Sequence, residues 1–255
     1  MNAGPLCLLV SALIVGWAAA VPPADNPDVY ASDSQITARF CKTDFTPDGD
    51  LDKAAWKHAE WVEFAHDMRG DRSYRGARTR VAALWSRDYV YFGFSSYYDR
   101  LNIYEGENPI NERWELWKKD VVEVFVNAQP ERLNHYYEFE VAPNNQWIDL
   151  EIDKTKVPFN DAGWNSGFTH ATRIGGRPKS SDATAQEHVW TCEMRIPVAA
   201  LGVNSMPPAH DWRVNFFRAD GFGSDADRRL LAWSTIPEGT TFHVPTRFGR
   251  LRFVQ

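Results

Sequence analysis

The stretch WELWKKDVVEVFVN, residues 114–127, ends as a β-strand that carries an acid in its middle. From residue 120 onward, three valines alternate with a second set in which Glu123 shares a face with Phe125. A carboxylate among β-branched and aromatic side chains must be solvated, paired or engaged with a ligand, because burying it bare costs several kcal/mol. Glu123 is therefore the first candidate functional residue, and Trp114 and Trp117 stand just upstream of it.

The same alternation recurs in short segments along the whole chain. We expect strands at Ile36–Lys42, Arg78–Ser86, Tyr89–Tyr97, Asp120–Asn127, Tyr136–Val141, Trp147–Ile152, Phe168–Ile174, Val189–Ile196, Arg213–Arg218, Leu230–Ser234 and Arg250–Val254. Convincing helical segments are confined to Leu51–Ala59 and Val198–Leu201. So many short strands with so little helix predict an all-β fold, an antiparallel two-sheet β-sandwich or jelly roll with a few short helices.

Two neighbouring segments, YYEFEVAP (136–143) and QWIDLEID (146–153), extend the acidic pattern. Each alternates an apolar face with a polar and aromatic one, and the polar sets are Tyr136, Glu138, Glu140, Trp147, Asp149 and Glu151. We expect the two strands to pair and to place these residues on one solvated face of the sheet. An aromatic ring beside carboxylates suits a sugar, because its C–H faces stack on the ring while its hydroxyls donate to the acids. The pattern therefore favours carbohydrate over peptide or nucleotide.

The composition limits the classes of partner. The formal net charge is −6, and no basic cluster with interleaved aromatic residues offsets it, which argues against a nucleic-acid partner. Roughly 235 residues remain once the N-terminal segment is set aside, within the ~200–250 residues of a single all-β domain. One domain accounts for the chain.

The chain opens with MNAGPLCLLVSALIVGWAAAVPPAD, in which an apolar run from Leu6 to Val15 precedes small residues at Ala18 and Ala20. This pattern predicts a secretory signal peptide over residues 1–20, with a membrane anchor as the alternative, although the run is shorter than the ~20 residues that span a bilayer. Residues 21–34 form a leader, and residues 35–255 form the β-sandwich domain. We expect a secreted or periplasmic protein that is free of the membrane after cleavage.

The sequence leaves open whether the two cysteines pair and whether an acidic segment binds calcium. Cys41 and Cys192 remain after signal cleavage and form either a disulfide or two separate buried thiols. The sequence has no CxxC or HExxH motif of the kind that indicates zinc. Asp48, Asp50 and Asp52 in PDGDLD imitate a calcium loop without the rest of an EF-hand pattern, so a turn is the first interpretation and a structural calcium site the second.

Six blocks of sequence, in one order, resemble carbohydrate-binding module family 9 and its DOMON-like relatives. They are DGDLDKAAWKHA (48–59), RVAALWSRDYVYFGF (80–94), WKKDVVEVFVN (117–127), YYEFEVAPNNQWID (136–149), WTCEMRIPVAALG (190–202) and HVPTRFGRLRF (243–253). The resemblance covers about residues 36–253. It implies a DOMON-like β-sandwich that binds sugars, often at a chain end, between two aromatic rings with polar residues around the rim.

The resemblance also implies site residues. The first clamp aromatic falls on Trp117, and the acid that accepts hydrogen bonds from the sugar falls on Glu123. The second clamp aromatic falls on Phe242, and a basic residue before the AWS strand falls on Arg228 or Arg229. This placement would explain why Glu123 interrupts its strand, because its carboxylate would point up beneath the ring of Trp117.

The sequence departs from the family at two site positions. Glu140 stands where the best-known sugar binders have a basic residue, which reverses the local charge, and Gly239 replaces an asparagine. The loops at residues 98–116 and 157–167 are longer than in the family and could narrow or redirect the cleft. If the clamp lies elsewhere, the candidate aromatics are Trp147 and Trp114.

Three functions compete. The favoured one is a secreted carbohydrate-binding module without catalytic residues, which holds a plant-polysaccharide-type oligosaccharide or chain end and supports carbohydrate catabolism beside glycoside hydrolases. The second is a glycoside hydrolase of xylanase or glucanase type that uses two of the strand carboxylates. The third is a haem-binding DOMON-like domain with Met68 or Met194 as an axial ligand, although the sequence has no CxxCH motif.

Overall fold

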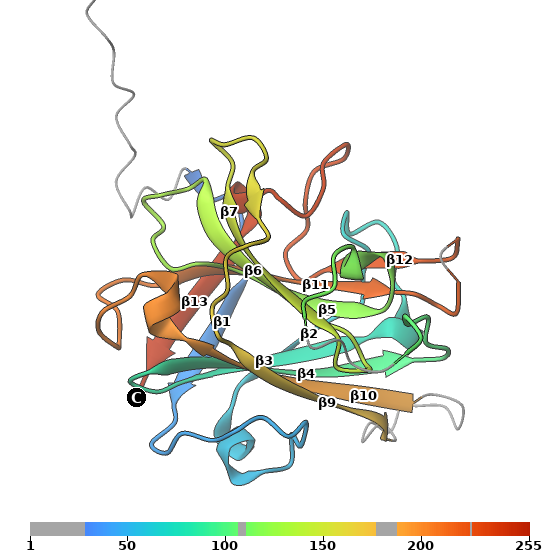
Figure 1. Cartoon of the computed structure of the whole chain (residues 1–255), viewed down its shortest axis with the longest axis horizontal. Coiled ribbons are helices and arrows are strands. Elements are labelled where there is room, and N and C mark those ends of the chain that lie inside the picture. Colours follow the sequence, from blue (N-terminus) through green and yellow to red (C-terminus); the bar gives the residue numbers. More distant parts are fainter. Residues whose placement is uncertain (1–28, 107–110, 177–187, 225) are drawn as a thin grey trace, which may run out of the picture.

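The computed structural model in Figure 1 describes residues 29–106, 111–176, 188–224 and 226–255. The expected signal peptide, residues 1–20, lies outside the described residues, as does most of the leader. The described strands are β1 (Gln35–Phe40), β2 (Trp61–Phe64), β3 (Thr79–Trp85), β4 (Tyr89–Tyr98), β5 (Val121–Asn127), β6 (His135–Val141), β7 (Trp147–Asp153), β8 (Asn160–Asp161), β9 (Thr169–Gly176), β10 (His188–Pro197), β11 (Trp212–Asp220), β12 (Arg229–Ala232) and β13 (Gly249–Val254). Every strand expected from the sequence overlaps one of these, and β2 and β8 are additional.

Helix is confined to single short turns in the part of the chain that the structure describes. The turns are η2 (Ala54–His58), η3 (Arg75–Ala77), η4 (Leu116–Lys118), η5 (Val198–Leu201) and η6 (Pro245–Arg247), all of 3-10 type. Both expected helical segments are present, the first in shortened form. Across the described ranges, none of the helices has the length and apolar character needed to cross a membrane.

The strands form one curled sheet whose two halves face each other. Its order is β8-β7-β6-β5-β11-β13-β1-β3-β4-β10-β9, with β12 beside β11 and β2 beside β3. In Figure 1 the upper layer contains β5, β6, β7 and β11, and the lower layer contains β3, β4, β9 and β10. Most neighbours are antiparallel, but β1 runs parallel to both β13 and β3. The expected all-β sandwich is confirmed, with the correction that its sheet is mixed.

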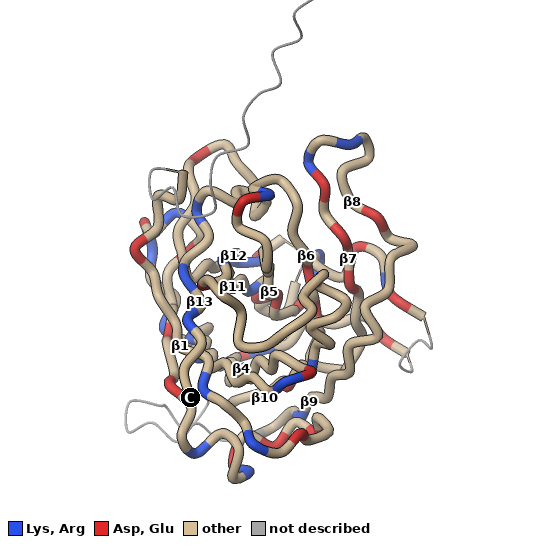
Figure 2. Tube along the Cα trace, turned by 90° about the vertical axis from the view of Figure 1, so that its left-hand side faces the viewer, with Lys and Arg blue, Asp and Glu red and all other residues tan. Residues whose placement is uncertain are grey.

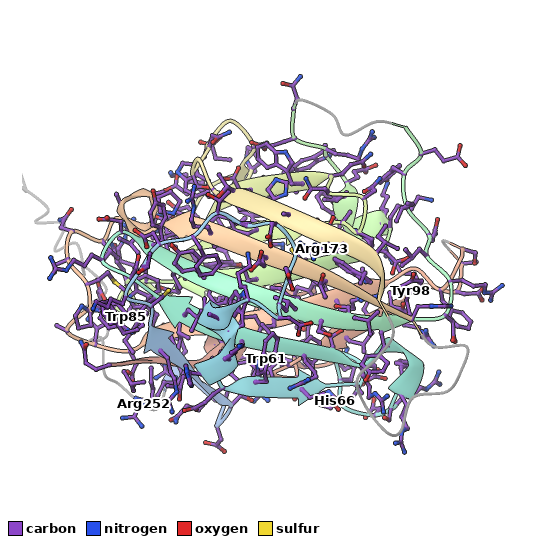
Figure 3. The ribbon with its side chains drawn as sticks, turned by 90° about the horizontal axis from the view of Figure 1, so that it is seen from below. Trp61, His66, Trp85, Tyr98, Arg173 and Arg252 are labelled. Atoms are coloured by element: carbon purple, nitrogen blue, oxygen red, sulfur yellow. The ribbon has the colours of Figure 1, made fainter. Side chains whose placement is uncertain are left out.

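The main hydrophobic core fills the space between the two layers. Phe216 of β11 meets Phe92 of β4 edge to face, with ring centroids 5.7 Å apart, and Trp190 of β10 is fully buried in the same core. Figure 3 shows the lower layer from beneath as a row of adjacent strands, β9, β10, β4 and β3. Trp85 is buried in this core, whereas Trp56 of the turn η2 is buried in a separate cluster with Leu84 and Tyr91. Strand alternation supplies the core residues of the strands, because every second side chain points to the same face.

The predicted acidic surface of β6 and β7 is wrong in two respects. Directly opposite residues of an antiparallel pair share a face, and here Glu140 lies opposite Glu123 while Phe139 lies opposite Asp149. Glu138 and Glu140 therefore share the face of Glu123, whereas Asp149 shares the opposite face with the core residue Phe139. These acids are also buried rather than solvated, and Glu140 and Asp149 have no exposed surface at all. Figure 2 shows acidic positions inside both strands.

Trp147 and Glu151 share the core side of β7 with Asp149. Trp147 packs edge to face on Phe168, with ring centroids 5.4 Å apart, and Glu151 lies 2.8 Å from His135 Nε2. The physical reason is register, because a shift of one residue between paired strands transfers a whole side-chain set to the other face.

The two cysteines of the described chain are both free. Cys192 is buried in the main core, and the Cys41 thiol donates to the carbonyl of Thr43 at 3.0 Å. Of the two arrangements that the sequence leaves open, the structure has separate thiols.

Candidate functional site

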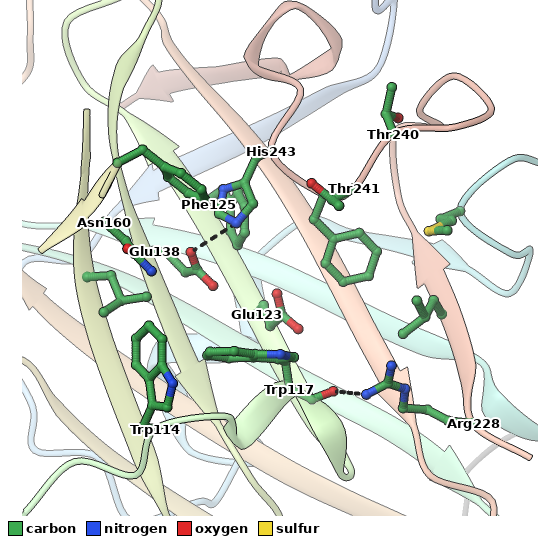
Figure 4. Close-up of a pocket in the computed structure, with 15 residues that line it drawn as sticks. Trp114, Trp117, Glu123, Phe125, Glu138, Asn160, Arg228, Thr240, Thr241 and His243 are labelled. Atoms are coloured by element: carbon green, nitrogen blue, oxygen red, sulfur yellow. Dashed lines mark hydrogen bonds and ion pairs between the residues drawn. The ribbon is translucent and has the colours of Figure 1, made fainter. Parts of the chain in front are cut away.

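The outer face of β5, β6, β7 and β11 carries a second hydrophobic cluster under a cover of loops. Leu116, Ile236 and Phe248 come from these loops and are buried with Phe125 and Phe217 of the strands. A pocket of about 460 Å³ lies in this face, within the ~300–1,000 Å³ typical of small-molecule sites. Figure 4 shows its lining, which includes Trp114, Trp117, Glu123, Phe125, Glu138, Leu150, Phe159, Asn160, Arg228, Thr241, Phe242 and His243.

Trp117 is held at one side of the pocket by the turn η4. Glu115 enters this turn with left-handed backbone (φ 65°), and the buried Leu116 anchors it in the cluster. The Arg228 guanidinium donates from Nη1 to the Trp117 carbonyl at 2.8 Å, which ties the turn to the start of β12. Trp114 meets Trp117 edge to face at 5.0 Å and is 49% exposed, so the two indoles form an aromatic rim.

The loop of residues 240–243 supplies another part of the lining. Phe242 stacks on the buried Phe217, with ring centroids 4.0 Å apart and an interplanar angle of 10°. Arg69 holds the loop from outside by donating to the Thr240 carbonyl at 2.7 Å. The ring of Phe242 is therefore fixed before any ligand arrives.

Three carboxylates converge beside the pocket from β5 and β6. Glu123, Glu138 and Glu140 are 1%, 4% and 0% exposed, and one carboxylate oxygen of each lies within 4.8 Å of the others. Glu123 and Glu138 line the pocket, and Figure 4 shows Glu123 pointing into the space between Trp117 and the loop that carries Thr241. We call Glu123, Glu138 and Glu140 the carboxylate cluster.

Burial dominates the electrostatics of the carboxylate cluster. It raises the pKa of Glu123 and of Glu140 well above the usual range, and the neighbouring carboxylates raise both further. Burial also raises the pKa of Glu138 to about 7. The positive charge of Arg228 acts on Glu123 in the opposite direction.

His243 lies between the carboxylate cluster and aromatic side chains of the pocket. Its Nδ1 lies 3.0 Å from the Tyr136 hydroxyl and its Nε2 lies 3.9 Å from Glu138 Oε2. Phe125 and Phe159 pack on its ring at 5.1 and 4.9 Å. Burial lowers the pKa of His243 to about 4, so the ring is neutral at pH 7, with one nitrogen donating and the other accepting a hydrogen bond.

Residues 48–255 match the family described as carbohydrate family 9 binding domain-like. The chain belongs to this family. The resemblance inferred from the six sequence blocks is thereby confirmed.

Relatives of this family 9 chain are distant in sequence. An extracellular protein of Arthroderma benhamiae is 25% identical over 179 residues, which are 69% of this chain and 79% of that protein. A Bacteroides uniformis crystal structure, provisionally described as a carbohydrate-binding protein, superposes with a TM-score of 0.65 at 17% identity, covering 88% of this chain and all of that one.

Two further structures are family 9 modules from Caldicellulosiruptor kristjanssonii. One, in complex with cellotriose, has a TM-score of 0.59 at 15% identity and covers 86% of this chain and 93% of that one. The other, in complex with glucose, has a TM-score of 0.58 at 16% identity and covers 87% and 96%. At such low identity the superpositions establish the shared fold.

The pocket of this family 9 chain brings together four of the residues expected at the site. Trp117, Glu123, Phe242 and Arg228 all line it. Glu140 lies behind Glu123 in the carboxylate cluster. Trp114, an alternative clamp aromatic, also lines the pocket. Two other candidates are elsewhere: Arg229 donates from Nε to Asp220 and lies over Phe222, and Trp147 packs on the core side of β7.

Several lining residues were missed by sequence reasoning. His243 directly follows Phe242, so its place in the loop was readable, but its contact with Glu138 depends on how the loop folds over β6. Phe159 and Asn160 come from a long loop without periodicity, and no sequence signal marks them.

Asp48 and Asp50 are engaged with cations of the chain. Asp48 lies 2.7 Å from Lys53 Nζ, and Asp50 lies 3.4 Å from Arg173 Nη1. Each also caps the loop by accepting a backbone hydrogen bond from the residue two positions on. This is the geometry of the turn that the sequence favours.

Proposed function

We propose that this chain binds carbohydrate in the pocket, with a sugar ring held by Trp117 and Phe242 and its hydroxyls directed to Glu123 and Glu138. The observation that carries the proposal is the pairing of aromatic rings with inward carboxylates in one pocket of sugar size. The apolar C–H face of a sugar stacks on an aromatic ring, and its hydroxyls donate charge-assisted hydrogen bonds to carboxylates.

The rigidity of the aromatic residues supports binding. Phe242 is stacked on Phe217, and Trp117 is tied through its carbonyl to Arg228. Side chains that are already fixed lose little conformational freedom when a ligand arrives, which favours affinity. Trp114, half exposed at the rim, provides a further ring for a second sugar unit.

The family relatives support the ligand class. Family 9 modules of this fold have been solved with glucose and with cellotriose, so gluco-configured sugars are the first ligands to test. The departure at Glu140 places an acid beside the site, which changes the local charge but preserves an oxygen-rich floor for hydroxyl donors.

Export completes the proposal. The apolar run before Ala20 and the extracellular relative both support a secreted protein that acts on carbohydrate outside the cell, beside glycoside hydrolases. N-terminal sequencing of material from the culture medium is expected to begin near Val21. Intact Met1 on cytoplasmic protein would contradict export.

The experiment is a titration of the mature chain with glucose and cellotriose by calorimetry. Trp117→Ala is expected to lose about 1–3 kcal/mol, the scale of burying a large apolar side chain, and so to bind about 5- to 150-fold more weakly. Trp147→Ala is the matched control, because its indole is also half buried but lies on the other face of the sheet. Equal affinity of native protein and folded Trp117→Ala would overturn the clamp.

Glycoside hydrolysis is the second candidate, because Glu123 and Glu138 both open into the pocket. Hydrolysis requires two carboxyl groups on either side of the scissile bond, one acting as acid and the other as nucleophile or base. Reducing-sugar release is therefore measured in the same samples. Binding without release assigns the protein to carbohydrate binding, and release that disappears in Glu138→Gln assigns it to hydrolysis.

A further inference from the structure

The carboxylate cluster has a geometry of its own. Glu123 lies opposite Glu140 across the β5–β6 pair, and Glu138 is two residues from Glu140 on the same face, so strand pairing alone brings the three together. One oxygen from each lies within 4.8 Å of the other two. Oxygens bound to one calcium ion at ~2.3–2.6 Å are separated by no more than about 5 Å, so a single ion can contact all three.

The oxygens of the cluster have no partners outside it. Glu138 and Glu140 interact with each other, but no other described residue hydrogen-bonds to the buried Glu123 Oε1, Glu138 Oε2 or either oxygen of Glu140. A buried carboxylate without a partner is costly, and native structures normally provide one. The unpartnered oxygens of Glu140, which has no exposed surface, are directed into the cluster.

The basic side chains of this part of the sheet do not fill this need. Arg218 is fully buried on the other face of β11, where it lies opposite Val122 and binds Asp120 and Asp220 at 3.0 and 3.1 Å. Arg228 donates to the Trp117 carbonyl and acts on Glu123 only through its charge. His243 approaches Glu138 no closer than 3.9 Å.

We propose that Glu123, Glu138 and Glu140 bind a divalent cation of the calcium class at the floor of the pocket. The ligands are all carboxylate oxygens, which hard cations such as calcium prefer, whereas zinc and copper favour sulfur and imidazole. A divalent ion together with the Arg228 guanidinium would balance the three negative charges. The cation also supplies a partner for one buried oxygen of each carboxylate.

The position of the cluster gives the ion a role in binding, and this step rests on the proposed carbohydrate function. Glu123 and Glu138 line the pocket, and Glu140 lies opposite Glu123 without lining it, so an ion bound by all three sits at the pocket wall and its open coordination positions can face the ligand. Calcium takes six to eight oxygen ligands and three carboxylates can leave several positions unfilled. Sugar hydroxyls can occupy them.

The first test measures calcium itself. The full mature chain is treated with a chelator, dialysed and titrated with calcium chloride by calorimetry at pH 7. We expect one saturable site with a dissociation constant of about 10⁻⁶–10⁻³ M. Glu140→Gln is expected to weaken it at least about tenfold, since one charged ligand is lost. Glu138→Gln gives the same comparison if Glu140→Gln fails to fold.

Asp50→Asn is the matched control, because it removes a carboxylate from the other acidic segment, the loop of residues 48–52. Calcium binding that survives in Asp50→Asn and is lost in Glu140→Gln supports the proposal. Absence of saturable binding in the native chain, equal binding in folded Glu140→Gln, or loss of binding in Asp50→Asn would each overturn it.

The second test measures glucose and cellotriose affinity in calcium chloride and in chelator. Weaker sugar binding in chelator supports contact between ion and sugar, and equal affinity overturns that contact. Sugar binding without calcium binding rejects the cation site and leaves the proposed carbohydrate function intact. Calcium binding without sugar binding supports the cation site and rejects the carbohydrate function, so the two failures are distinguishable.

Discussion

Glu193 on β10 and Glu140 on β6 are both completely buried, yet their surroundings differ. The Glu193 carboxylate accepts hydrogen bonds from the backbone nitrogens of Asp48 and Gly49, from Lys53 Nζ and from Trp56 Nε1, at 2.6–2.9 Å. Glu140 has no described partner outside the carboxylate cluster. Burial alone therefore does not separate a structural acid from a functional one, whereas the supply of donors does.

The donors of Glu193 come from a loop shaped to fit it. Gly49 has φ 78°, and a Cβ there would lie 2.8–2.9 Å from atoms of Arg173 and Thr172. A side chain at this position would push the loop away from β9, so glycine allows the backbone to reach Glu193. The carboxylate cluster faces a pocket instead, and its partner has to come from solution.

The largest expected effect is on stability at Glu193. Glu193→Ala leaves Lys53 and the Trp56 indole without their buried acceptor and should lower the free energy of unfolding by about 3–5 kcal/mol. Urea denaturation measures the loss. Glu193→Gln keeps an acceptor oxygen and should lose less. A loss below about 1 kcal/mol for Glu193→Ala would show that the donors around Glu193 do not make it more stabilising than Glu140.

Next in size is an effect on sugar affinity at Arg228. Arg228→Ala removes the hydrogen bond to the Trp117 carbonyl, worth about 0.5–1.5 kcal/mol, and should weaken sugar binding about 2- to 12-fold. The adjacent Arg229 is the control, because it binds Asp220 away from the pocket. Calorimetric titration should show unchanged affinity in folded Arg229→Lys, and a drop equal to that of Arg228→Ala would argue against the tether.

Glu140 should behave oppositely to Glu193 in stability. Glu140→Gln replaces a buried carboxyl group, whose neutral form burial already favours, and takes a partner from no donor outside the carboxylate cluster, so the free energy of unfolding in chelator should stay within about 1 kcal/mol of the native value or rise. The same urea experiment reports it. A loss as large as that of Glu193→Ala would show that Glu140 has a stabilising partner in the folded chain.

The smallest expected effect is a pH dependence at Asp48. The hydrogen bond from Lys53 lowers the pKa of Asp48 from 3.8 to about 2, so its contribution is complete above pH 4 and is lost as the pH falls toward 2. The contribution is below about 1 kcal/mol, because Asp48 is more than half exposed. Acid unfolding of Asp48→Asn should lack this component, and identical profiles of the two proteins between pH 4 and 2 would contradict it.

Much of the fold follows from local sequence. Each long strand was recognisable because alternation over six or more residues reports a half-buried sheet. The four-residue β2 and the two-residue β8 were missed, because segments so short carry little period; β12, as short as β2, was expected because it overlaps the apolar run of residues 230–233. Parallel pairing of β1 with β13 and β3 joins segments far apart in the chain, and no local pattern encodes it.

The candidate site divides in the same way. Alternation within β5 already singled out Glu123, and the family resemblance placed Trp117 and Phe242, which the structure brings into one pocket. Alternation also predicted which residues share a face within β6 and within β7. It did not predict which face of β7 lies on the same side of the sheet as the Glu138 face of β6, because that depends on the register of their hydrogen bonds.

By itself, the sequence determined that this protein is a β-sandwich of family 9 with an acid at Glu123 that requires a partner. Tertiary structure decided which acids gather there. The β5–β6 register placed Glu140 opposite Glu123, and loops carrying Leu116 and Phe248 covered a face that alternation predicted to be solvated. The physical reason is that strand patterning is local, whereas register and loop cover arise from contacts between distant segments whose energies act only once the chain is folded.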